Sequence, residues 1–123
     1  MGGLISMYAL CEYPEIFHGA ACLSTHWVGT FDTLNNPIPL KFAEYLDNNL
    51  PDAHSHLIYF DFGTETLDAL YEPYQTIVDS IMIKHDFHTK NWKTMKFEGE
   101  NHSEKAWNKR LDIPLKFLLG IDK

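Results

Sequence analysis

The stretch that decides the fold is MGGLISMYALCEYPE, residues 1–15. Two glycines open it, apolar residues at helical spacing fill nearly every side, and Pro14 closes it. This pattern predicts a central helix that is buried on nearly all sides. The helix would begin at the first residue of the chain, with nothing before it to cap its free amides, which is unusual for a buried element.

Helical and strand-like segments alternate after this stretch. Apolar or bulky runs bounded by turn residues predict strands at residues 19–24, 55–62 and 92–97. Apolar faces at helical spacing predict helices over residues 38–50, 67–82 and 103–120. The last two helices contain Pro73 and Pro114, and each proline should interrupt, kink or restart its helix. The alternation predicts an α/β fold of three parallel strands joined by right-handed crossovers.

Composition narrows the class of protein. A chain of 123 residues with 45% hydrophobic content suits one globular domain at most. The net charge of −7 argues against nucleic acid as a partner, because that binding depends on clustered basic residues. No apolar run could cross a membrane and no export signal opens the chain, so the sequence as it stands predicts a cytoplasmic protein. The compartment stays open if an N-terminal signal has been lost. Cys11 and Cys22 are expected to be buried free thiols.

Polar residues follow each of the three expected strands, at residues 24–27, 63–66 and 99–103. In a parallel sheet these loops meet beyond the carboxyl ends of the strands, where reactive groups gather. An acid after one strand and a histidine after the next, such as Glu65 and His102, could form an acid–base pair in which the carboxylate orients the imidazole.

These segments resemble the esterase family of α/β-hydrolases that includes esterase D-like, feruloyl and enterochelin esterases. The opening Met1-Gly2-Gly3-Leu4 is similar to the second half of the family's nucleophile elbow, cut just after the serine. Gly63-Thr64-Glu65 resembles the setting of the family's acid, with the acid one place closer. Gly99-Glu100-Asn101-His102, followed by Trp107, resembles the setting of its histidine. The resemblance spans essentially the whole chain and implies that residues 1–123 are the C-terminal portion of a single α/β-hydrolase domain, a partial α/β-hydrolase fold.

The resemblance also implies roles for particular residues. His102 would be the general base, Glu65 the acid that orients it, and the Met1 N–H a donor of the oxyanion hole. Other acids near Glu65 are Asp61, Asp68 and Glu100. His26 and Trp27 could line the substrate pocket, although Trp27 could instead cover the end of the sheet. Each assignment has a plainer alternative, such as a helix-capping histidine for His102 and a first-turn helix acid for Glu65.

The function implied by the resemblance is hydrolysis of a small-molecule carboxylic ester by a serine esterase, without a cofactor. The nucleophilic serine is absent from the chain, so this chain alone is expected to be inactive. Its partner would be the missing N-terminal part or a second copy. The alternative is a non-catalytic remnant or interaction module. Ser24 lacks a glycine elbow and is a poor substitute nucleophile. No metal is expected, because the pairs His54–His56 and His85–His88 lack a recognisable third ligand.

Overall fold

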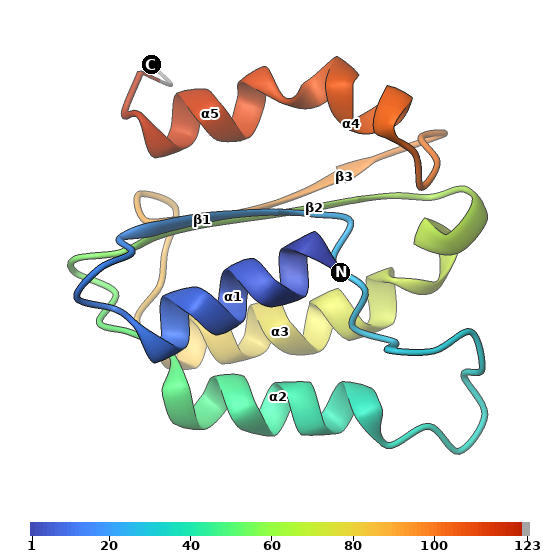
Figure 1. The fold of residues 1–123 in the computed structure, drawn as a ribbon, viewed down its shortest axis with the longest axis horizontal. Coiled ribbons are helices and arrows are strands. Elements are labelled where there is room, and N and C mark those ends of the chain that lie inside the picture. The colour runs from blue at the N-terminus through green and yellow to red at the C-terminus, as the bar shows by residue number, and fades with distance from the viewer. Residues whose placement is uncertain (122–123) are drawn as a thin grey trace.

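The computed structural model describes residues 1–121 of the chain, and it confirms the alternation of helices and strands (Figure 1). Strands β1 (Gly19–Leu23), β2 (Leu57–Gly63) and β3 (Trp92–Phe97) lie within one residue or two of the expected positions. The helices are α1 (Gly2–Glu12), α2 (Ile38–Asn49), α3 (Glu72–Lys84), α4 (Glu104–Arg110) and α5 (Asp112–Leu118), with a short 3-10 helix, η1 (Thr66–Leu70), before α3.

The three strands form one parallel sheet in the order β1-β2-β3. Helix α1 packs on β1, and α5 packs on β1 and β2 from the opposite face (Figure 1). Helix α2 contacts both α1 and α3 and forms an outer layer below them. The central strand is covered on both faces and is buried from Ile58 to Gly63, which explains its unbroken run of bulky residues. The expected parallel α/β sheet is therefore confirmed.

Both internal prolines begin new helices. Pro73 lies in the first turn of α3, and Pro114 lies in the first turn of α5. A proline is tolerated there because the first amides of a helix have no partner within it. The apolar pattern over residues 67–82 is therefore divided between η1 and α3, and the last helix is divided between α4 and α5.

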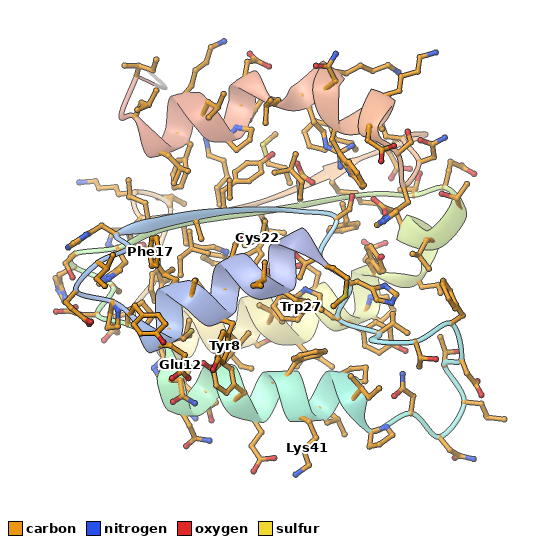
Figure 2. All side chains as sticks on the ribbon, viewed as in Figure 1. Tyr8, Glu12, Phe17, Cys22, Trp27 and Lys41 are labelled. Atoms are coloured by element: carbon orange, nitrogen blue, oxygen red, sulfur yellow. The ribbon has the colours of Figure 1, made fainter. Side chains whose placement is uncertain are left out.

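Trp27 fills the space between the sheet and α2 (Figure 2). Its ring meets Phe42 of α2 and Phe60 of β2 at centroid distances of 6.0 and 5.9 Å. Its indole N–H donates to Gln75 Oε1 of α3 at 2.8 Å, so the one polar atom of this buried ring is satisfied. One side chain thus joins the loop after β1 to helices α2 and α3.

The expectation that α1 is buried on nearly all sides is wrong for this chain. The helix buries Gly3, Met7 and Leu10, whereas Ile5 and Tyr8 are 68% and 53% exposed. The sheet covers only one side of the helix, and α2 covers part of another. An apolar side of α1 therefore faces outward in the structure.

The thiols of Cys11 and Cys22 are free, as expected. Cys22 is fully buried in β1, whereas Cys11 is half-buried. Burial raises the pKa of the Cys11 thiol to about 12 and also raises that of Cys22, so both thiols are held in their protonated form near neutral pH. No helix among residues 1–121 is long and apolar enough to cross a membrane.

Candidate active site

The loops after β2 and β3 are tied together at the carboxyl edge of the sheet. The backbone amides of Thr64 and Glu65 both donate to the Glu100 carbonyl oxygen, at 2.9 and 3.0 Å. In return, the Thr64 hydroxyl accepts the Gly99 amide at 2.8 Å. These contacts hold the loop after β2 against the loop after β3, as the sequence led us to expect for neighbouring parallel strands.

Gly63 makes this close approach possible. A Cβ atom at residue 63 would overlap the Glu100 carbonyl oxygen, which is backbone and cannot move aside. We expect Gly63→Ala to lower the free energy of unfolding by about 3 kcal/mol, because overpacking at a rigid contact displaces both loops. Chemical denaturation measures this loss. Gly2→Ala is the matched control, since nothing lies within 4 Å of its added Cβ, and an equal loss in both variants would contradict the argument.

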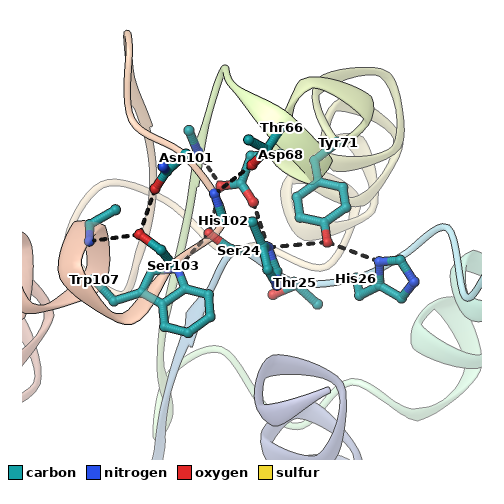
Figure 3. Close-up of polar contacts among 12 residues, drawn as sticks. Ser24, Thr25, His26, Thr66, Asp68, Tyr71, Asn101, His102, Ser103 and Trp107 are labelled. Carbon is teal, nitrogen blue, oxygen red and sulfur yellow. Dashed lines mark hydrogen bonds and ion pairs between the residues drawn. The ribbon is translucent and has the colours of Figure 1, made fainter. Parts of the chain in front are cut away.

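A histidine and a buried carboxylate meet where these loops are joined (Figure 3). His102 Nδ1 lies 2.7 Å from Asp68 Oδ1. The side chain of Asp68 is fully buried, and its other oxygen accepts the Gly63 amide and the Ser24 hydroxyl, each at 2.6 Å. A carboxylate can only accept hydrogen bonds, so the contact with Asp68 Oδ1 assigns the hydrogen of a neutral His102 to Nδ1.

The imidazole of His102 is held from several directions. The rings of Trp107 and Tyr71 meet it edge-on, at centroid distances of 5.0 and 5.9 Å. Its backbone amide donates to Thr66 Oγ1 at 2.9 Å. The second ring nitrogen, Nε2, makes no hydrogen bond with any residue of the described part of the chain. With Nδ1 donating to Asp68, Nε2 is the free base of the ring.

The imidazole borders a pocket of about 290 Å³ that is shared with the first turn of α1. The lining residues are Met1, Gly2, Gly3, Ser6, Ala21, Leu23, Ser24, His102 and Trp107. Gly3 lets the helix approach the loop after β1, since a Cβ there would lie 2.5 Å from Thr25 Oγ1. The partial positive charge at the start of α1 therefore faces the same space as the base.

The carboxylate that meets His102 is Asp68, and the expectation that Glu65 does so is corrected. Glu65 precedes η1 with an extended backbone, and it is exposed. Thr66 then takes a positive φ of 56°, which turns the chain so that Asp68 points back into the site. The other two candidates have different partners: Asp61 pairs with Arg110, and Glu100 pairs with Lys109. Asp68 is one of the alternative acids named from the sequence, but no periodic pattern distinguishes it from Glu65.

Of the two residues expected to line the substrate pocket, neither borders the cavity beside His102. Trp27 belongs to the core, which was its plainer alternative. His26 lies close by, with Nδ1 2.9 Å from the Tyr71 hydroxyl, which is in turn 3.5 Å from His102 Nδ1. Burial lowers the pKa of His26. His26 is therefore a neutral neighbour of the site near pH 7.

The four histidines of the pairs His54–His56 and His85–His88 all have hydrogen-bond partners. His54 pairs with Asp52, and His85 pairs with Asp47, at 3.0 and 2.8 Å. Within residues 1–121 there is no group of three or more histidine, cysteine, aspartate or glutamate side chains that could hold a metal ion.

Comparison of the chain with protein-family models, with curated proteins and with solved structures finds no match. The structure itself defines the class: an α/β protein with a parallel sheet and a carboxylate–histidine pair beyond the carboxyl ends of its strands.

Proposed function

We propose that this chain is the C-terminal part of a serine carboxylic-ester hydrolase of the α/β-hydrolase superfamily, similar to esterase D-like enzymes. His102 is the general base and Asp68 is the acid that orients it. The observation that supports this best is the 2.7 Å contact between Asp68 Oδ1 and His102 Nδ1, which leaves Nε2 free beside a pocket. Acid, histidine and the start of a helix are the parts that ester hydrolysis needs besides a nucleophile.

In the proposed reaction, Nε2 of His102 removes the proton from a serine hydroxyl as its oxygen attacks the ester carbonyl carbon. The carbonyl oxygen becomes an oxyanion, which backbone amides at the start of α1, with that of Met1 first, would stabilise. The imidazolium then returns its proton to the departing alcohol, leaving an acyl-enzyme. Water, activated by the same Nε2, releases the carboxylic acid and restores the serine. A pocket of about 290 Å³ suits a small ester with a short acyl group.

The hydroxyls of the two serines that line the pocket, and that of the neighbouring Thr25, are already engaged. Ser24 donates to Asp68, Ser6 donates to the Gly2 carbonyl at 2.9 Å, and Thr25 donates to the Cys22 carbonyl at 3.4 Å. The proposal therefore places the nucleophile on a serine directly before Met1 in a longer protein. Met1 lines the pocket with His102, so a residue joined to it would enter the same space.

The composition of the two edge strands favours a further strand beside β1 in the longer protein. Strand β1 is Gly-Ala-Ala-Cys-Leu and carries no charge or proline, whereas β3 at the other edge carries Lys93 and Lys96. Natural edge strands are commonly protected by lysines or prolines, because an unprotected edge pairs with other chains. By this criterion β3 has the composition of an edge strand, whereas β1, although it lies at an edge here, has the composition of an interior strand, which is consistent with an N-terminal part that continues the sheet.

Hydrolysis of p-nitrophenyl acetate tests the proposal. The assay compares the 123-residue chain with the same chain extended by the in-frame segment encoded upstream. We expect activity only in the extended protein. A well-folded extended protein without activity toward short-chain esters would contradict an esterase and favour a remnant that kept the fold without the chemistry.

The identity of the acid gives a second test in the extended protein. We expect Asp68→Asn to lower kcat by about 10⁴-fold, because the single amide oxygen would stay with the two donors Ser24 and Gly63, so that the NH2 group faces Nδ1 and imposes the wrong tautomer. Glu65→Gln, the matched control from the same loop, should change kcat less than twofold. A larger loss of kcat in Glu65→Gln than in Asp68→Asn would show that Glu65, and not Asp68, is the acid that orients His102.

A further inference from the structure

The hydroxyl of Ser24 is in contact with the acid on the side away from His102 (Figure 3). Its Oγ lies 2.6 Å from Asp68 Oδ2, while Asp68 Oδ1 faces the imidazole. Ser24 is 2% exposed, so water does not compete for this contact. The two carboxylate oxygens of Asp68 therefore have different partners. Oδ2 accepts hydrogen bonds from Ser24 and the Gly63 amide, and Oδ1 is left for His102.

Two donors determine where the Ser24 hydrogen points. The indole N–H of Trp107 donates to Ser24 Oγ at 2.9 Å, and Nη2 of Arg110 donates to it at 3.1 Å. A hydroxyl has two lone pairs and one hydrogen, so these donors occupy both lone pairs. The hydrogen is left for Asp68 Oδ2, and the nearby guanidinium makes the hydroxyl a better donor.

Arg110 is itself fixed by a buried carboxylate. Its Nε and Nη2 donate to the two oxygens of Asp61 at 3.0 and 2.9 Å, and both side chains are almost fully buried. The backbone amide of Ser24 also donates to the Asp61 carbonyl, at 2.9 Å. This holds Ser24 at a φ of 48°, a conformation that non-glycine residues rarely adopt. A continuous network therefore runs from Asp61 through Arg110 and Ser24 to Asp68 and His102.

We infer that Ser24 is a positioning residue: its hydroxyl, oriented by Arg110 and Trp107, holds Asp68 so that His102 keeps its hydrogen on Nδ1 and its base on Nε2. The inference rests on the proposed function for its catalytic meaning. The geometric claim itself concerns only which nitrogen of His102 carries the hydrogen. That property can be measured without a substrate or a nucleophile.

The test is the tautomer of neutral His102 in the 123-residue chain, read from the ¹⁵N chemical shifts of its imidazole. We expect nearly all molecules of the wild-type chain to carry Nδ1–H. In Ser24→Ala we expect this population to fall at least twofold in favour of Nε2–H, because Asp68 loses the donor that orients it. Ser24→Gly removes the same hydroxyl and suits the positive φ, so it should give the same change without backbone strain.

Ser80→Ala is the matched control, since its hydroxyl donates to the Thr76 carbonyl on the exposed side of α3. A folded Ser24→Ala or Ser24→Gly chain that keeps the wild-type tautomer would overturn the inference. Loss of the fold in both variants would also overturn it, because Ser24 would then be a structural residue. In an active extended esterase, Ser24→Gly should lower kcat at least 10-fold and leave KM unchanged. Absence of esterase activity leaves the tautomer result intact, so the two failures are distinguishable.

Discussion

His102→Ala is expected to lower kcat/KM for p-nitrophenyl acetate by at least about 10⁴-fold in the extended protein, without loss of the fold. The variant removes the imidazole base that lines the pocket, the one histidine among the lining residues of the described chain, 1–121. A positioned base contributes about 10²–10⁴-fold by proton transfer, and without it a serine hydroxyl is a weak nucleophile. In energetic terms a 10⁴-fold loss is about 5.5 kcal/mol of transition-state stabilisation.

The matched control for this prediction is His54→Ala. The side chain of His54 is 87% exposed and pairs with Asp52. His54 precedes β2 in the chain, whereas the site lies beyond the carboxyl end of β2. We expect it to keep wild-type activity. Circular dichroism of both variants separates a chemical loss from a structural one. If a folded His102→Ala enzyme kept more than a tenth of the wild-type kcat/KM, the proposed base would be wrong.

Arg110→Met is expected to cause the largest loss of stability, about 3–5 kcal/mol in the free energy of unfolding. The substitution fills a similar volume but leaves Asp61 fully buried without its ion-pair partner. It also removes the guanidinium from the ring of Phe97, 4.9 Å below it. For a chain of this size the melting temperature should fall by roughly 10 °C or more, as measured by differential scanning calorimetry.

The deficit of Arg110→Met should depend on pH in a defined direction. Burial raises the pKa of Asp61, and Arg110 opposes that rise; without Arg110 the pKa of Asp61 in the folded state rises further. A group with a raised pKa in the folded state binds more protons there than when unfolded, so stability falls as the pH rises through that pKa. The deficit should therefore be larger at pH 8 than at pH 5.

Two comparisons check this account of the buried ion pair. Lys109→Met, on the neighbouring residue, replaces an exposed partner of Glu100 and should cost less than about 1 kcal/mol. Replacing Asp61 and Arg110 together by Leu and Met should restore part of the loss, because no unpaired charge remains buried. A double variant as unstable as the sum of the single ones would show that the two charges are not coupled.

The elements of this fold could be predicted because each carries a local pattern. The unbroken apolar run of β2 and the helical spacing in α2 and α3 identify their type without knowledge of their neighbours. The prolines at 73 and 114 indicated breaks, and the structure confirms that both restart a helix. The exposure of Ile5 and Tyr8 could not be predicted this way, because the apolar pattern of α1 does not show which side a neighbour covers.

By itself the sequence determined the α/β class, the parallel direction of the strands and the loops that meet at their carboxyl edge, because these follow from local periodicity and from the handedness of crossovers. Only the tertiary structure decided which acid faces His102. Glu65, Asp68 and Asp61 lie within seven residues of one another, and a single positive φ at Thr66 with the turn of η1 directs one carboxylate to the imidazole. Ser24 and Arg110 join that pair through contacts across 44 and 86 positions of the chain, and such distant hydrogen bonds leave no periodic trace in the sequence.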